Sequence, residues 1–230
     1  MPLAKLAGTS DLGAGRAVRT EPIQQRSAER LDALLDSAAY VVDQVGFDRI
    51  TTAMIADHAG ASIGTVYRYF PDRVAVLSAL RDRSMARFRA RVAFDIQDSS
   101  PQNWWQAIDL AITAFVDLYR TEPGFHIVHF TERQSVAGGP VAGADAEQEL
   151  VAHSGDDSFP VRLAAVLSDE FGLDGGPELL FRLEVAIEIA DGLLSRAFRD
   201  DPDGDSRFIA ECRAVAHGYL VSYYGGPETA

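Results

Sequence analysis

Hydrophobic residues recur at three- and four-residue steps along most of the chain, which is the spacing of amphipathic helices. The first such stretch begins at Ser27, whose hydroxyl can cap a helix, and ends at Gly46. We predict further helices over residues 52–58, 62–69, 72–96, 102–120, 124–133, 160–171, 177–199 and 205–223. Because no stretch alternates apolar and polar residues with the period of two typical of strands, the chain is predicted to be all-α.

The segments outside these helices set the predicted domain boundaries. Residues 1–26 contain several glycines and prolines without apolar periodicity, and are interpreted as a flexible N-terminal arm. Residues 134–158 are rich in Gly, Ala, Ser and Asp, and are predicted to be a loop. The remainder divides into a small helical domain, 27–72, and a larger helical domain, 73–230.

Two short predicted helices between Thr51 and Phe70 are joined by a three-residue turn that contains Gly60. This is the plan of a helix-turn-helix, in which Ala56 is small where the helices cross and Gly60 can adopt a left-handed backbone. A small core can form from Ile55, Ala59, Ile63 and Val66. The outward face of the second helix then carries Ser62, Gly64, Thr65, Tyr67, Arg68 and Tyr69. These polar groups suit the phosphate oxygens and base edges of DNA.

This stretch resembles the TetR (tetracycline-repressor-like) family of bacterial transcriptional regulators. The resemblance extends over residues 27–77 and is carried by Thr51-Thr52, Ile55-Ala56, Ala59-Gly60, Ser62, Gly64-Thr65, Tyr67, Tyr69-Phe70 and Leu77. The family favours lysine where this chain has Arg73, and the positive charge is retained. The resemblance implies a three-helix helix-turn-helix DNA-binding domain at 27–72, followed by a helical ligand-binding and dimerisation domain.

The resemblance also implies which residues contact a double-stranded DNA operator. The second short helix would enter the major groove, with base edges contacted by Ser62, Gly64, Thr65 and Arg68. Backbone phosphates would be bound by Thr51, Thr52, Tyr67, Tyr69 and Arg73. For Tyr67 the alternative role is packing inside the helix-turn-helix. The arginines of the arm either enter the minor groove or belong to a solvated tail: Arg16, Arg19 and Arg26.

The distribution of charge removes an apparent objection to DNA binding. The whole chain has a net charge of −13. However, the residues up to Val92 include 13 basic and 10 acidic side chains, whereas those beyond it include 8 basic and 24 acidic ones. The acidity therefore belongs to the C-terminal part, and a slightly basic module precedes it. A group of widely spaced arginines is interpreted as a solvated helix face: Arg81, Arg83, Arg87, Arg89 and Arg91.

Composition excludes several other classes of protein. The chain is 47% hydrophobic and 24% charged, as globular proteins are. Its single cysteine, Cys212, excludes an internal disulfide and a thiolate metal cluster. Without an apolar run of about 18 residues or a secretory signal, we expect a cytoplasmic protein with no membrane partner. No phosphate-binding glycine loop, zinc motif or serine elbow is present, so we expect neither an enzyme nor a cofactor.

The last two predicted helices are interpreted as a dimer interface. Family members that this chain resembles pair through these helices, which form a four-helix bundle with the partner. The helix at 177–199 is apolar around most of its circumference and therefore needs burial on two sides. The expected interface residues are Leu183, Ile187, Leu194, Val215 and Leu220. A plain core helix is the alternative. In a homodimer, two recognition helices about 34 Å apart match a palindromic operator.

Aromatic and polar residues of the C-terminal domain are candidates for an effector site. They are Asp95, Trp104, Trp105, Phe115, His126, His129, Phe130, Arg133, Glu184, Glu188 and Asp191. An apolar cavity with a few polar groups is the usual form of such a site, although aromatics at helical spacing are more often core. His126 and His129 have a spacing that permits metal binding, but without a third ligand a role in ligand binding or in the core is favoured.

We therefore predict a ligand-responsive transcriptional regulator, most simply a repressor, that binds its operator as a homodimer. A small apolar or aromatic effector would enter the C-terminal domain and shift the helix at 72–96, which changes the separation of the recognition helices. The alternative is a helical adaptor or scaffold without sequence-specific DNA binding.

Overall fold

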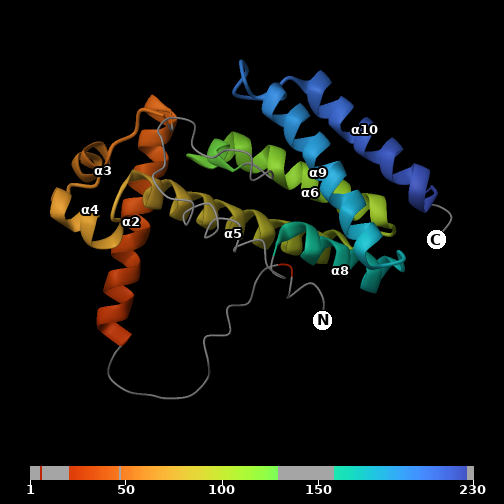
Figure 1. Ribbon diagram of the computed structural model, residues 1–230, viewed down its shortest axis with the longest axis horizontal. Helices are drawn as coiled ribbons and strands as arrows, with labels where there is room; N and C mark the ends of the chain where they lie inside the picture. Colours follow the sequence, from red (N-terminus) through yellow and green to blue (C-terminus); the bar gives the residue numbers. More distant parts are fainter. Residues whose placement is uncertain (1–5, 7–20, 47, 129–157, 227–230) are drawn as a thin grey trace. The chain divides into compact units, whose positions relative to one another are not determined.

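The computed structural model describes Leu6 and residues 21–46, 48–128 and 158–226, the side chains of 21–25 excepted. Every element within these ranges is helical, which confirms the all-α prediction (Figure 1). The elements are α2 (Glu21–Val45), α3 (Thr52–His58), α4 (Ile63–Tyr69), α5 (Arg73–Ser99), α6 (Trp104–Thr121), the 3-10 helix η1 (Phe125–Ile127), α8 (Phe159–Phe171), α9 (Pro177–Ala197) and α10 (Ser206–Tyr224). No helix in the described part is long and apolar enough to cross a membrane.

The chain forms two compact units. Within the described residues, the N-terminal unit consists of 21–46, 48–87 and Thr121–Val128, and the C-terminal unit consists of Leu6, Phe88–Arg120 and 158–226. Helix α5 thus contributes its first half to one unit and its second half to the other. The segment Thr121–Val128, which begins at the last residue of α6, belongs to the N-terminal unit, whereas Arg120 directly before it belongs to the C-terminal one.

The N-terminal unit has a continuous core built by α2, α3, α4 and the start of α5. The stripe predicted along the first helix is buried, and Leu34, Ala38 and Val42 are fully inaccessible. Against it pack the buried side chains of Ile50, Ile55, Ala56, Val66, Phe70, Val76, Leu77 and Leu80. This core fixes α3 and α4 relative to α2. The expectation that Ile63 joins it is wrong: as the first residue of α4, Ile63 is exposed, and Val66 fills the space.

Two predicted helix boundaries need correction. Helix α2 begins at Glu21 rather than at Ser27, because Pro22 lies in the first turn, where its missing N–H costs no hydrogen bond. Ser27 is therefore inside the helix, and its hydroxyl lies 3.3 Å from that of Tyr69. The helix predicted over 124–133 is also wrong in its described part. There the chain forms only η1, preceded by Gly124 with a left-handed backbone and followed by extended Val128.

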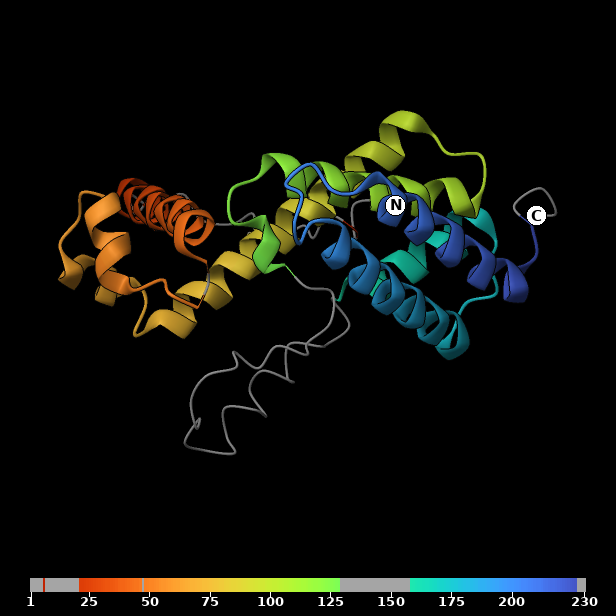
Figure 2. The same cartoon turned by 90° about the horizontal axis from the view of Figure 1, so that it is seen from above.

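In the C-terminal unit, α6, α8, α9, α10 and the second half of α5 surround a second core. Its largest fully buried side chains include Phe88, Trp104, Phe115, Leu167 and Leu179. Helices α9 and α10 pack against each other along their length (Figure 2). Cys212 of α10 is buried in this core.

Candidate functional site

Side-chain caps define the two short helices of the N-terminal unit. Thr51 caps α3, since its hydroxyl accepts a hydrogen bond from the Met54 N–H at 3.2 Å. Ser62 caps α4 in the same way, accepting from the Thr65 N–H at 3.1 Å. Between them Gly60 has a φ of +56°, the left-handed backbone predicted for the turn. These contacts give α3 and α4 the geometry of a helix-turn-helix.

One face of α4 is open to solvent. Ser62, Gly64, Tyr67 and Arg68 are exposed, and Thr65 is half-buried. The Ser62 and Thr65 hydroxyls lie 2.9 Å apart, so the start of this face forms a polar pair. With small residues at its N-terminal end and a guanidinium in its last turn, this helix can approach a polyanion closely.

The two tyrosines of α4 have different environments. Tyr67 is 52% exposed, whereas Tyr69 is half-buried and packs against the core of the N-terminal unit. The Tyr67 hydroxyl accepts a hydrogen bond at 3.3 Å from the hydroxyl of Thr52, the first residue of α3. The packing role considered for Tyr67 is thus taken by Tyr69, and the Tyr67 ring remains on the surface.

Arg73, at the start of α5, holds the segment before α3. Its Nη1 donates to the Asp48 carbonyl oxygen at 2.9 Å. Arg49 in the same segment donates from Nε to the Val45 carbonyl at 2.7 Å. Both guanidiniums stay accessible in part, so they are positioned by the backbone and can also contact a phosphate.

The C-terminal unit contains an apolar cavity. The cavity has a volume of about 50 Å³, and about 480 Å³ when the solvent-open space around it is included. Its lining is Phe88 from α5, Ile108, Ala111, Ile112 and Phe115 from α6, Phe159 and Leu163 from α8, Leu183, Ala186, Ile187, Ala190 and Leu194 from α9, and Ala216 and Leu220 from α10. Every described residue that lines it is apolar. Such a cavity selects a ligand by shape and hydrophobicity.

Most of the predicted effector residues that the structure describes lie outside the lining of the cavity. Phe115 lines the cavity. Trp104 is buried nearby in α6, with no hydrogen-bond partner for its indole N–H among the described residues, and Trp105 packs against His217 at 4.6 Å between ring centroids. Asp95 binds the Arg91 guanidinium at 2.8 Å.

The predicted acidic residues of α9 lie away from the lining. Glu184 and Glu188 are exposed. Asp191 is half-buried beside Tyr119, whose pKa is raised first by burial and second by the charge of Asp191. His129, Phe130 and Arg133 lie outside the described residues.

His126 is placed in the N-terminal unit. It lies in η1, with Nδ1 3.2 Å from Oδ1 of Asp43 in α2. Among the described residues, no group of three or more His, Cys, Asp or Glu side chains converges in a way that could hold a metal ion.

Four residues expected in the dimer interface line the cavity instead: Leu183, Ile187, Leu194 and Leu220. Their side chains are directed into their own protomer. The expected Val215 is partly exposed on α10, and near it in the sequence Tyr223 is exposed as well. Phe181 of α9 is also exposed, and Arg182 lies over the rings of both Phe181 and Tyr223.

Sequence reasoning missed the alanines of the lining and the residues that hold η1. Ala111, Ala186 and Ala190 leave room for the cavity. Small residues on otherwise bulky helix faces are the signal in the sequence that could have revealed this cavity. Gly124 follows Pro123, a pair that marks a turn and argues against a helix starting there.

Two domain families match the chain. "Tetracyclin repressor-like, C-terminal domain" matches residues 102–224, and "Bacterial regulatory proteins, tetR family" matches residues 34–80. The crystal structure of a TetR-family transcriptional regulator from Streptomyces coelicolor is 30% identical, covers 84% of this chain and 98% of that one, and superimposes with a TM-score of 0.68. The fatty acid degradation regulator FadR from Bacillus halodurans shares the fold. It is 17% identical, covers 84% of this chain and 96% of its own, and superimposes with a TM-score of 0.61.

Curated relatives match a shorter stretch. The transcriptional repressor KstR of Mycobacterium tuberculosis is 32% identical over 63 residues, which are 27% of this chain and 29% of KstR. The fatty acid metabolism regulator protein of Bacillus subtilis is 30% identical over 67 residues, 29% of this chain and 34% of that protein. The chain thus spans about a third of the length of these relatives.

The two domain matches, together with the fold, establish the family. The larger match covers more than half of the chain, and the smaller one covers the helix-turn-helix described above. The chain belongs to the TetR family of bacterial regulatory proteins, which are DNA-binding transcription factors and not enzymes.

Proposed function

We propose that this protein is a transcriptional repressor that binds a palindromic operator as a homodimer and is released by a small apolar effector. The observation that carries the proposal is the pairing of two features in one chain. One is a helix-turn-helix whose second helix presents a polar, solvent-open face, and the other is an apolar cavity built by α6 and α9. A protein with this role acts in the cytoplasm, where the bacterial chromosome lies.

The N-terminal unit would read the operator through α4. Arg68 is the candidate for a guanine, since its guanidinium can donate two hydrogen bonds to one base edge. Ser62, Gly64 and Thr65 would lie close to the bases. Thr51, Thr52, Tyr67, Tyr69 and Arg73 would contact phosphates, with the N-terminus of α3 adding its partial positive charge.

The homodimer would form through the exposed side of α9 and α10. Phe181 is 50% exposed and Tyr223 is 49% exposed, and Val215 adds further apolar surface. Exposed aromatics beside an arginine are characteristic of protein interfaces. Leu183, Ile187, Leu194 and Leu220 would support this surface from the inside, where they also shape the cavity.

The effector would be a hydrocarbon with its polar group at one end. The described lining offers no polar side chain, so a polar group inside the cavity would lose its hydrogen bonds to water without replacement. Two relatives are regulators named for fatty acid metabolism and fatty acid degradation, which supports a fatty acyl chain as the first candidate.

The test is selection of duplexes from a random DNA pool, followed by titration of the selected duplex at several salt concentrations. We expect a palindromic site, bound by two chains, and displacement of the protein when dodecanoate or a longer fatty acid is added. Binding that is equal for all duplexes and depends only on salt contradicts the repressor and favours the adaptor.

A further inference from the structure

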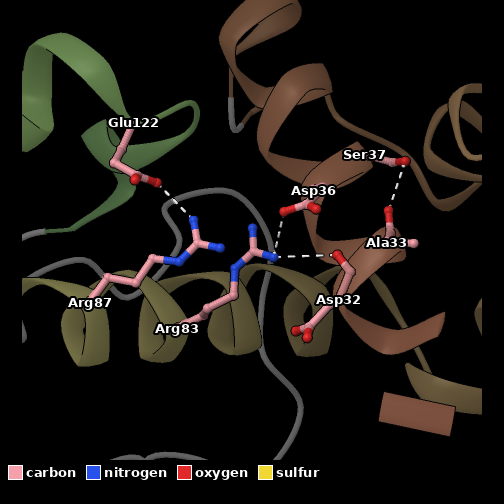
Figure 3. Close-up of polar contacts among 7 residues, drawn as sticks. All are labelled: Asp32, Ala33, Asp36, Ser37, Arg83, Arg87 and Glu122. Atoms are coloured by element: carbon pink, nitrogen blue, oxygen red, sulfur yellow. Dashed lines mark hydrogen bonds and ion pairs between the residues drawn. The ribbon is translucent and has the colours of Figure 1, made fainter. Parts of the chain in front are cut away.

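The arginines of α5 differ in what surrounds them. Arg83 donates from Nη1 to Oδ1 of Asp36 at 2.8 Å, and Arg87 donates from Nη1 to Oε2 of Glu122 at 2.7 Å, as Figure 3 shows. The interpretation of these arginines as a solvated face is thus wrong for Arg83 and Arg87, which bind carboxylates of the N-terminal unit. Arg89 belongs to the C-terminal unit and has a different environment.

Arg89 begins on the buried side of α5. Phe88 directly before it is fully buried and lines the cavity, and Val92 and Ala93, three and four positions later, are buried as well. Positions three and four apart share one side of a helix, so Arg89 starts from the same side as Val92 and Ala93. Its Nε is inaccessible to solvent. The C-terminal unit therefore encloses part of the Arg89 side chain.

Arg162 is a charged residue on the buried side of α8. It is only 9% exposed, and Phe159, Leu163 and Val166 on the same side are buried too. Phe159 and Leu163 line the cavity. Because side chains of a helix lean toward its N-terminus, the Arg162 side chain leans toward the turn that carries Phe159. A positive charge thus lies beside the lining of the cavity.

Arg89 and Arg162, which we call the arginine pair, lie near each other. The rings of Phe88 and Phe159, which precede them on their helices, pack with 4.8 Å between centroids. The pKa of Arg162 is lowered, first by burial and second by the charge of Arg89. Arginine still keeps its proton at neutral pH. Helices α5 and α8 therefore each bring one positive charge to this side of the cavity.

The arginine pair has the chemistry to bind a carboxylate. A guanidinium presents its N–H groups in a planar fork that matches the two carboxylate oxygens. Two guanidiniums have more donors than one carboxylate can accept, so the pair can bind a ligand carboxylate in addition to acceptors of the chain itself. Beyond Val92 the chain has 8 basic and 24 acidic side chains. An anionic ligand therefore needs a local positive site in a part of the chain that otherwise repels it.

We propose that the arginine pair binds the carboxylate of the effector, whose hydrocarbon chain occupies the apolar cavity beside Phe88 and Phe159. The inference rests on the proposed function and specifies the effector as an unesterified fatty acid in its anionic form. An alcohol or a thioester of the same chain has no carboxylate at that end. Arg89 and Arg162 then determine which head group is accepted, whereas the apolar lining responds to the chain.

Three compounds with the same hydrocarbon chain test the inference: dodecanoate, dodecan-1-ol and dodecylamine. Each is titrated into the full chain by calorimetry at pH 8, below the concentration at which it aggregates. An apolar cavity alone would favour the alcohol, because a carboxylate loses its hydration there. With the arginine pair we expect dodecanoate to bind at least about tenfold more tightly than the alcohol, and the positively charged amine to bind most weakly.

Replacing either arginine should remove the preference for the anion. In Arg89→Gln and in Arg162→Gln, the ratio of dodecanoate affinity to dodecanol affinity should fall at least about tenfold, while the affinity for the alcohol changes less than about twofold. The ratio is measured within one variant, so a general loss of stability does not alter it. If Arg162→Gln does not fold, Arg162→Lys keeps the charge without the planar fork and should give an intermediate ratio.

Arg91→Gln is the matched control. It removes the same charge from α5 two positions after Arg89, where Arg91 binds Asp95 at 2.8 Å, and the ratio should stay that of the unaltered protein. An equal fall of the ratio in Arg91→Gln would attribute the preference to the overall charge and overturn the inference.

Two further outcomes overturn the inference while the proposed repressor stands. One is an unaltered protein that binds the alcohol as tightly as dodecanoate. The other is a folded Arg89→Gln or Arg162→Gln variant with an unchanged ratio. Failure of the proposed function gives different results. A protein that binds none of the three compounds contradicts the fatty acyl effector, and the inference with it, whereas a protein that selects no duplex contradicts the repressor and leaves the ratio measurable.

Discussion

The Thr52 hydroxyl donates a hydrogen bond to the Tyr67 hydroxyl across the helix-turn-helix, at 3.3 Å. Thr52 is buried at the N-terminus of α3, whereas Tyr67 stands on the exposed face of α4. This bond ties the residue proposed to bind phosphate at the start of α3 to the surface proposed to face DNA.

Replacing Tyr67 with phenylalanine should therefore affect both stability and DNA binding. The buried Thr52 hydroxyl loses its acceptor, so the free energy of unfolding should fall by about 1 kcal/mol. Operator affinity should fall as well, because a phosphate-binding hydroxyl is removed. Urea unfolding and a gel shift measure the two effects. Tyr40→Phe, on α2, is the control, and an equal loss of affinity in that variant would contradict the role of Tyr67.

Arg68 and Arg73 should separate sequence readout from phosphate binding. Arg68→Ala should cost about 1–3 kcal/mol on the selected duplex and relax the preference at one base pair. Arg73→Ala should weaken binding to all duplexes and reduce the slope of log affinity against log salt. Binding to the selected duplex and to a scrambled one at four salt concentrations distinguishes the two. If Arg68→Ala lowers the affinity for both duplexes equally, Arg68 does not contact a base.

Filling the cavity should abolish the response to the effector without abolishing DNA binding. Ala111 lines the cavity on α6, and a leucine there occupies space that a hydrocarbon chain would need. In Ala111→Leu we expect no rise of the melting temperature with dodecanoate, whereas a protein that binds this ligand is stabilised. Ala210→Leu, at an exposed position of α10, should respond like the unaltered protein. A retained response in Ala111→Leu would place the effector elsewhere.

A charge on the exposed face of α9 should separate the protomers. Phe181→Glu places a carboxylate where we propose a second copy to pack, and burying it there costs several kcal/mol. Sedimentation equilibrium should show monomer for this variant. Phe94→Glu, at an exposed phenylalanine on α5, is the matched control and should remain dimeric. Loss of the dimer in both variants would indicate a general loss of structure.

Cys212 should report unfolding. Burial, more than the charge of Asp109, raises the pKa of its thiol to about 11, although Arg213 opposes the shift. A raised pKa leaves almost no thiolate at pH 8, and the buried sulfur is inaccessible as well. The folded protein should thus react slowly with a disulfide reagent at pH 8 and fast in urea, where the pKa returns toward its ordinary value. Fast reaction of the folded protein would show that α10 opens locally.

The helix-turn-helix could be predicted because all the information for it is local. Thr51, Gly60 and Ser62 each act on residues within four positions, and the apolar stripe of α2 reveals the buried side whatever covers it. The start of α2 is harder to predict, because Pro22 is typical of loops, although a first helical turn accepts proline equally well.

The remaining features depend on partners far away in the sequence. Gly124 bonds to Asp43, 81 positions earlier, so nothing near Gly124 indicates that the chain leaves α6 to pack on α2. Periodicity showed that one side of α9 is buried, and could not show that Leu183 and Leu194 face a cavity of their own protomer rather than a second chain. A helical wheel gives the apolar side of a helix and leaves the neighbour undetermined.

The wholly apolar lining of the cavity has a consequence for what the protein can distinguish. No described side chain of the lining can form a hydrogen bond with a hydroxyl or carbonyl of a ligand. Two ligands that differ by one methylene would therefore differ in binding free energy by about 0.8 kcal/mol, which is roughly fourfold in affinity. If the effector is the proposed hydrocarbon, the protein would respond to its bulk and length, in graded fashion across a homologous series. Its output would report the abundance of a chemical class in the cell, summed over members, and not the presence of a single metabolite.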